Sequence, residues 1–316
     1  MNYRTLGRTG LRVSTLGLGT VELGLDYGIG APGEFGRPSD AAAIHLVHAA
    51  LDAGINFVDT ARAYGESERV LGQALKNRRT DVVLATKVDP RRPDGGIWEA
   101  EAMRRFMQES LETSLRLLQT DHIDIWMIHS IDAALLQQRE IIAEVFAAAR
   151  QRGQIGWTGA SFYGTELPGK ALGYDLFDVM QVTYSVLDQR LNEDVFPRAA
   201  AQNVGVVVRS ILLKGALTAR AEHLPPRLEP LRMRSRQFRD LLTATNDGMT
   251  PAQGAIAFGL TNPHIDTILV GVRTEAELAE DLAAVDMQLT PQELSKLQAL
   301  GVDDESLLDP STWGIP

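Results

Sequence analysis

Four side chains that together could protonate a carbonyl oxygen stand at or just after the ends of short apolar runs. They are Asp59 after INFV, Tyr64 five residues later, Lys87 after VVLAT and His129 after IDIWMI. A phenol with a pKa of about 10 is a weak acid at neutral pH, and a lysine ammonium beside it lowers that pKa. A carboxylate would keep the ammonium charged, and an imidazole could orient the carbonyl or relay the proton. The set predicts a tuned tyrosine acid, with a cofactor supplying the hydride that the protein lacks.

These side chains can meet only if the runs they follow are neighbouring strands that end at one edge. Apolar runs typical of strands covered on both faces alternate along the chain with helical patterns. The expected strands are 14–20, 55–60, 82–88, 122–129, 155–161, 178–185, 204–210 and 265–271. The expected helices are 39–53, 66–77, 98–118, 135–152, 165–173, 192–202, 250–260 and 274–284. Eight such units predict a (β/α)8 TIM barrel, whose chemistry lies at the C-terminal rim of the strands.

The remaining segments fit around one barrel. No Pro/Ser-rich linker divides the chain, so we predict a single domain over residues 1–316. Residues 1–14 contain the turn Arg8-Thr9-Gly10 and are expected to form a β-hairpin on the barrel floor. Long rim loops are expected at 21–38 and 211–249, and a C-terminal tail at 301–316. A doubly wound sheet is the alternative fold, but GLGTVELG lacks the spacing of its dinucleotide fingerprint.

Composition excludes several classes of function. The net charge of −10 argues against a nucleic-acid or membrane-surface binder. The chain has no cysteine, which rules out disulfides and zinc–thiolate sites, and we expect no metal site. The N-terminus has no signal-peptide core, and no run of about 18 apolar residues predicts a membrane span. We therefore expect a cytoplasmic protein whose partner is a small molecule.

The strings around the four side chains are those of a known family. DTARAYG, ATKV and IDIWMIHS resemble the aldo-keto reductase family, and the resemblance runs from YRTLGRTGLRVSTLGLGT to GVRTEAELAED. It implies a (β/α)8 barrel with a catalytic tetrad at Asp59, Tyr64, Lys87 and His129. Tyr64 would be the general acid, Lys87 and Asp59 would tune it, and His129 would help to hold the substrate carbonyl. The family binds NADP(H), less often NAD(H), along the rim.

The resemblance also implies cofactor contacts near the nicotinamide. Gly19 and Thr20 would lie by its ribose. Ser161 and Gln181 would bind the carboxamide, and the Tyr184 ring would stack on the nicotinamide. Many relatives have Asn where this chain has Phe162.

Contacts with the rest of the cofactor are implied by two further strings. In RSILLKGAL, Ser210, Leu212 and Lys214 would surround the pyrophosphate, with Ile211 in place of the usual proline. In GVRTEAELAED, which begins at Gly271, Arg273 would bind the adenosine 2′-phosphate and Glu280 the adenine. Glu277 and Asp281 replace a frequent Gln and Asn; they would repel a 2′-phosphate but could bind a ribose diol. NADP(H) is favoured over NAD(H).

Three aromatic residues are candidates for the substrate-binding pocket. Tyr27, Trp98 and Trp313 are candidate pocket walls.

The run RMRSRQFRD places arginines 232, 236 and 239 on one helical face. This face is either solvated or forms a clamp over the cofactor's phosphates.

Three functions are compatible with these residues. The first is an NADP(H)-dependent reductase of aldehydes, ketones or sugars. The second is an aldose 1-dehydrogenase that forms a lactone with NAD(P)+, which would use the same tetrad. The third, a remote alternative, is a non-catalytic nucleotide-sensing subunit of a channel.

Overall fold

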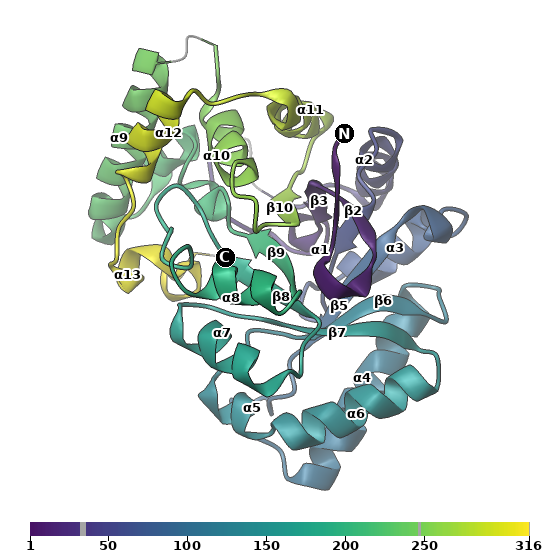
Figure 1. Ribbon diagram of the computed structural model, residues 1–316. Coiled ribbons are helices and arrows are strands. Elements are labelled where there is room, and N and C mark those ends of the chain that lie inside the picture. The colour runs from purple at the N-terminus through teal and green to yellow at the C-terminus, as the bar shows by residue number, and fades with distance from the viewer. Residues whose placement is uncertain (32–35, 246–247, 316) are drawn as a thin grey trace.

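The computed structural model describes residues 1–31, 36–245 and 248–315. Eight parallel strands in this part of the chain close into a barrel with helices outside it (Figure 1). The strands are β3 (Leu16–Gly19), β4 (Phe57–Asp59), β5 (Val83–Val88), β6 (Ile123–Ile128), β7 (Ile155–Ser161), β8 (Val179–Thr183), β9 (Gly205–Arg209) and β10 (Thr267–Gly271). Their order around the barrel follows the chain, and β10 pairs with β3 to close it. The predicted (β/α)8 barrel is confirmed.

The helices that cover the barrel fall where the periodicity predicts them. They are α2 (Asp40–Asp52), α3 (Ser67–Ala74), α4 (Ala100–Leu117), α6 (Arg139–Gln151), α7 (Glu166–Ala171), α8 (Val195–Ala201), α10 (Pro251–Leu260) and α11 (Glu275–Ala283). Further helices lie in the connections and toward the C-terminus: α1 (Val21–Gly24), α5 (Ala133–Gln137), α9 (Glu229–Thr245), α12 (Pro291–Gln298) and α13 (Glu305–Leu308).

The segment 211–249, which we expected to be a rim loop, contains the long helix α9. Leu231, Phe238 and Leu242 recur at helical spacing and are buried, which gives α9 an apolar face. Helix α12 packs beside α9 on the flank of the barrel (Figure 1). Residues 246–247 of this predicted loop, and residues 32–35 of the predicted loop 21–38, lie outside the described residues.

The N-terminal hairpin closes the floor of the barrel. Strands β1 (Tyr3–Thr5) and β2 (Arg12–Ser14) pair antiparallel. The turn between them touches the start of β9, where a Cβ on Gly7 would lie only 2.2 Å from the backbone nitrogen of Gly205. Leu6 from this hairpin joins the side chains inside the barrel. The expected hairpin is therefore present at the N-terminal ends of the strands.

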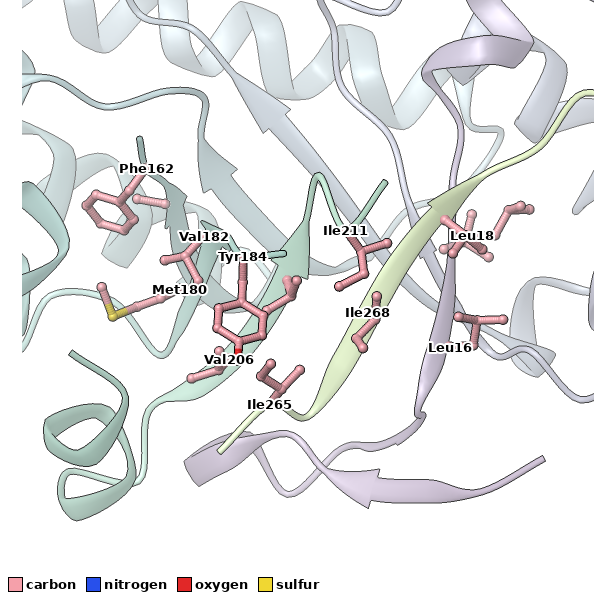
Figure 2. Close-up of a cluster of buried hydrophobic side chains, with 14 of the residues drawn as sticks. Leu16, Leu18, Phe162, Met180, Val182, Tyr184, Val206, Ile211, Ile265 and Ile268 are labelled. Carbon is pink, nitrogen blue, oxygen red and sulfur yellow. The ribbon is translucent and has the colours of Figure 1, made fainter. Parts of the chain in front are cut away.

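Alternation along each strand divides the buried side chains into two sets. One set fills the barrel interior, with Phe57, Ile125 and Val207 among its members. The other packs against the helices, and Figure 2 shows Leu16, Leu18, Val182, Val206 and Ile268 from it. Inward positions at the C-terminal end of each strand therefore point into the mouth of the barrel.

Candidate active site

The predicted tetrad comes together at the barrel mouth. Asp59 is the last residue of β4, Lys87 lies near the end of β5, and His129 directly follows β6. Tyr64 is in the loop between β4 and α3. The Tyr64 and His129 rings meet edge to face, with their centroids 5.5 Å apart. A carbonyl oxygen placed between these two side chains could accept a hydrogen bond from each.

Lys87 is the buried hub of this arrangement. Its Nζ donates to Asp59 Oδ2 at 2.5 Å, to the Thr60 carbonyl oxygen at 2.9 Å and to Tyr64 Oη at 3.5 Å. The Lys87 side chain is 0% exposed and that of Asp59 is 3% exposed. The second Asp59 oxygen accepts a bond from Gln181 Nε2 at 2.8 Å. Burial lowers the pKa of Lys87, and the Asp59 carboxylate opposes this by stabilising the ammonium.

The free protein holds Tyr64 in its protonated form. Burial, followed by the Asp59 carboxylate, raises the pKa of Tyr64, and the Arg209 guanidinium opposes this increase. We expected the pKa of Tyr64 to lie below its ordinary value because of Lys87, but the pKa of Tyr64 is raised. The physical reason is that the phenol is desolvated and that Asp59 sets a negative charge against the positive one on Lys87. A phenol that keeps its proton is suited to give it to a substrate oxygen.

His129 is neutral in the folded protein. Burial, with the positive charges of Lys87, Arg209 and Arg91, lowers the pKa of His129 to about 3. At neutral pH the imidazole can therefore hydrogen-bond to a carbonyl oxygen but carries no charge.

This shift predicts a pH-dependent stability. The folded pKa of His129 lies below its unfolded value of about 6.5, so between those values the unfolded chain binds the extra proton. Stability contributed by neutral His129 is present above about pH 6.5 and is lost as pH falls toward about 3. We expect His129→Asn to flatten the fall in urea-unfolding free energy between pH 6.5 and 5. The exposed His223→Asn is the control, and an unaltered slope in His129→Asn would contradict the assignment.

A cavity of about 290 Å³ runs from the tetrad along the barrel rim to Arg220 and Arg273. It is lined by Asp59, Tyr64 and His129, while Lys87 lies behind them. The other predicted residues that line it are Gly19, Thr20, Tyr27, Gln181, Ser210, Leu212, Lys214, Gly271 and Arg273. The predicted residues outside its wall are Ser161, Tyr184, Glu277, Glu280, Asp281, Trp98 and Trp313.

Tyr184 does not reach the cavity, contrary to its expected stacking on a nicotinamide. Its ring is buried, stacks on Phe258 at 5.8 Å between centroids and meets Phe196 edge-on at 5.4 Å. Figure 2 shows it inside the hydrophobic cluster. The reason lies in strand alternation: Gln181 and Tyr184 are three positions apart, so they point to opposite faces of the chain.

Three other predicted residues are held by the protein itself. Ser161 Oγ accepts a bond from the Ser130 backbone nitrogen at 2.7 Å. Trp313 is 1% exposed and its Nε1 donates to the Ser306 carbonyl oxygen, while the Trp98 ring stacks on Phe106. The two tryptophans therefore pack against the protein, and of the proposed substrate aromatics only Tyr27 lines the cavity.

Acidic groups stand behind the far end of the cavity. Glu277 bonds to Arg220 Nη2 at 2.5 Å and to the Arg273 backbone nitrogen at 2.7 Å. Asp281 is buried, and burial, with Glu280 and Glu277 nearby, raises its pKa well above the ordinary value. A protonated Asp281 would repel a phosphate less than the charged carboxylate that we expected.

The arginines of RMRSRQFRD are occupied elsewhere. Arg236 and Arg239 pair with Glu222, and Arg232 pairs with Glu229. None of the three lines the cavity, so of the two alternatives the clamp over the cofactor's phosphates is not formed in the described residues.

Several cavity residues were absent from the sequence prediction, notably Glu22, Tyr163, Arg209 and Arg220. The Glu22 carboxylate lies against Gly271, where a Cβ would come within 2.2 Å of Glu22 Oε1. Burial raises the pKa of Glu22 to about 7, and its Oε2 has no hydrogen-bond partner in the described residues. Arg209 had a sequence signal, because it ends β9 at an inward position.

The loop after β9 has an unusual backbone. Ser210, Leu213 and Lys214 have φ values of 61°, 47° and 53°, in the left-handed region that side chains rarely adopt. Ile211, in the position of the family's proline, is 1% exposed and anchors the loop in the core. Strained backbone that is held by packing commonly marks a ligand-binding segment.

The cavity suits an anionic nucleotide. Arg273 lines it, and its Nη1 is buried without a hydrogen-bond partner in the described residues. A phosphate oxygen would satisfy that donor. The loop 210–215 adds the Lys214 ammonium, which lies 4.9 Å from the centre of the Tyr27 ring.

No helix in the described residues is long and apolar enough to cross a membrane. No group of three or more His, Cys, Asp or Glu side chains in that part of the chain could hold a metal ion.

Comparison with known proteins gives consistent matches over almost the whole chain. Residues 15–302 match the sequence model of the Aldo/keto reductase family. The chain is 33% identical to L-galactose dehydrogenase of Arabidopsis thaliana over 97% of this chain and 92% of that protein. It is 29% identical to the aldo-keto reductase YhdN of Bacillus subtilis, over 88% and 87%. The solved structure of aldo-keto reductase AKR11C1 from Bacillus halodurans, in its holo form, superposes with a TM-score of 0.77 at 28% identity, covering 95% and 96%.

Proposed function

The chain belongs to the aldo/keto reductase family, and on that premise we propose that it is an NADP(H)-dependent oxidoreductase. It would interconvert a carbonyl, of an aldehyde, ketone or sugar, and an alcohol by hydride transfer. The observation that carries the proposal is the hydrogen-bonded set Asp59–Lys87–Tyr64, which faces a cavity beside neutral His129. The family generally uses nicotinamide cofactors and small-molecule carbonyl substrates.

The tetrad has a defined part in this reaction. Tyr64 and His129 hold the carbonyl oxygen, and Tyr64 gives it the phenolic proton. Lys87 then stabilises the phenolate that remains, and Asp59, fixed by Gln181, keeps the ammonium in place. A bound nicotinamide cofactor supplies the hydride, with its two electrons, to the carbonyl carbon.

The rest of the cavity would hold the cofactor. The residues proposed for this role are Gly19, Thr20, Gln181, Ser210, Leu212, Lys214, Gly271 and Arg273, which line it. Glu277 does not line the cavity, and its proposed role is to hold Arg220 and Arg273 in position through hydrogen bonds. Glu280 remains a proposed contact of the adenine. NADP(H) is favoured because the buried Nη1 of Arg273, which has no partner among the described residues, could donate to a 2′-phosphate. NAD(H) is the alternative because acidic side chains lie near Arg273, where they would repel a 2′-phosphate but could bind a ribose diol.

Arg273→Gln tests the cofactor preference. We expect the Kd for NADPH to rise about tenfold or more, while the Kd for NADH changes little, because only NADPH carries the 2′-phosphate. Quenching of tryptophan fluorescence gives both constants. Arg236→Gln, which changes an arginine paired with Glu222 away from the cavity, is the matched control. Equal weakening of both cofactors would reject Arg273 as the 2′-phosphate ligand.

A second candidate is an aldose 1-dehydrogenase that oxidises a sugar to a lactone with NAD(P)+. The observation in its favour is the 33% identity to L-galactose dehydrogenase. Steady-state rates separate the two: NADPH with aldehydes and ketones in one direction, and NADP+ or NAD+ with aldoses in the other. The proposal of a reductase fails if only aldoses with the oxidised cofactors are turned over.

A further inference from the structure

Arg209 is a cation at the reaction centre that the tetrad does not include. It is the last residue of β9 and pairs across the sheet with Thr183 of β8. Its guanidinium lies 3.9 Å from the centre of the Tyr163 ring, and its Nη2 donates to the Phe162 carbonyl oxygen at 3.0 Å. These contacts hold the side chain in the wall of the cavity that Tyr64 also lines.

No carboxylate of the described residues forms an ion pair with Arg209. Its contacts in the described residues are a ring, a carbonyl oxygen and the Ser210 hydroxyl. Among the described residues, two carboxylates line the cavity, those of Asp59 and Glu22. Asp59 is bonded to Lys87, and the Glu22 carboxylate lies against Gly271. At the reaction centre the charges of Asp59 and Lys87 offset each other, and Arg209 adds a positive charge. The Glu22 carboxylate, which also acts on Tyr64, opposes that charge in part, because its pKa of about 7 leaves it only partly ionised at neutral pH.

The field of that charge reaches all the groups that would handle the substrate. Arg209 opposes the increase in the pKa of Tyr64 and contributes to lowering the pKa of both Lys87 and His129. The carbonyl carbon is bonded to the oxygen that Tyr64 and His129 hold, and a hydride donor must stand within about 3.5 Å of that carbon. A nicotinamide ring that reacts here is therefore exposed to the same field.

The nicotinamide ring carries one positive charge when oxidised and none when reduced. We propose that Arg209 makes the site selective for the reduced cofactor, because its guanidinium repels the oxidised ring and not the neutral one. The same charge stabilises negative charge that develops on the carbonyl oxygen. At equal concentrations of the two forms, more of the protein therefore carries the reduced cofactor, which carbonyl reduction requires. The inference rests on the proposed function, since it assumes that a nicotinamide cofactor binds in this cavity.

The quantity to measure is the ratio of the Kd for NADP+ to the Kd for NADPH. Calorimetry gives the first constant and nucleotide fluorescence the second, at one pH and salt concentration, and the NAD+/NADH pair is measured in the same way. A unit charge in the same cavity as a charged ligand ring, in the effective dielectric of a protein, changes the affinity for that ligand by roughly ten- to hundredfold. We expect the wild-type protein to bind NADPH at least about tenfold more tightly than NADP+.

Arg209→Met removes the charge and should reduce that ratio by about tenfold, mainly by tightening NADP+. Arg209→Lys, which keeps the charge, should retain most of the preference. The matched control is Lys214→Met: Lys214 lines the same cavity, and a cation that binds phosphate should weaken both redox forms by the same factor. Arg209→Gln provides the same comparison if thermal melting shows that Arg209→Met does not fold.

An unchanged ratio in the folded neutral variants would overturn the inference. So would equal weakening of both forms by Arg209→Met, which would make Arg209 a phosphate ligand. If the wild-type protein binds neither redox form, the proposed function fails and this inference with it. Binding of both forms with an unaltered ratio refutes only the role of Arg209.

Discussion

Tyr64→Phe should lower kcat for carbonyl reduction by about 10³-fold, while the Kd for the cofactor stays within about twofold. The substitution removes one oxygen, the only atom by which this side chain can give a proton. The ring would still fill its place against His129, 5.5 Å from centroid to centroid. The loss should therefore appear in kcat, because the missing interaction is made in the transition state.

The measurement needs both single-turnover kinetics and cofactor binding. Hydride transfer is followed by loss of NADPH absorbance, and binding by tryptophan fluorescence. Tyr174→Phe is the matched control, since it removes the same oxygen from an exposed tyrosine away from the cavity. A Tyr64→Phe variant with near-normal kcat would reject Tyr64 as the acid. Loss of cofactor binding in that variant would instead indicate a structural effect.

The barrel could be predicted because its signals are local. Each apolar run is short enough to be a strand, and each is followed by a helical pattern, so the order of elements determines the topology. The helix α12 was missed although its start carries a capping box, Thr290 with Glu293. The helical character of 232–240 was recognised from its arginines, but the full length of α9 and its buried face of Leu231, Phe238 and Leu242 were not.

Some features of the site can be predicted from the sequence, and others depend on the three-dimensional packing. Asp59, Lys87 and His129 follow from strand ends and alternation, and the same alternation would have identified Arg209 and rejected Tyr184 as a cavity residue. Burial is different, because it depends on loops that are distant in sequence. The increased pKa of Tyr64 and the position of Glu22 against Gly271 are consequences of three-dimensional packing that no local string contains.

Lys87→Met is expected to have the largest effect on stability. The variant leaves Asp59 buried without its ammonium partner, and breaking a buried ion pair costs about 3–5 kcal/mol in the free energy of unfolding. Both side chains are at most 3% exposed, so solvent does not screen the pair. The exposed pair Lys170–Glu166 offers the matched control: Lys170→Met should change the free energy of unfolding far less, because water screens that pair. Urea unfolding measures the free energy of unfolding of both variants.

A double variant separates the two roles of Lys87. Asp59→Asn combined with Lys87→Met removes both charges, and Gln181 can still bond to the amide oxygen of the introduced asparagine, which takes the place of Oδ1 of Asp59. Most of the lost stability should return, because no uncompensated charge remains. Activity should not return, since nothing stabilises the phenolate of Tyr64 once its proton has left. If the double variant regains turnover together with stability, Lys87 only supports the fold, and the acid at Tyr64 works without it.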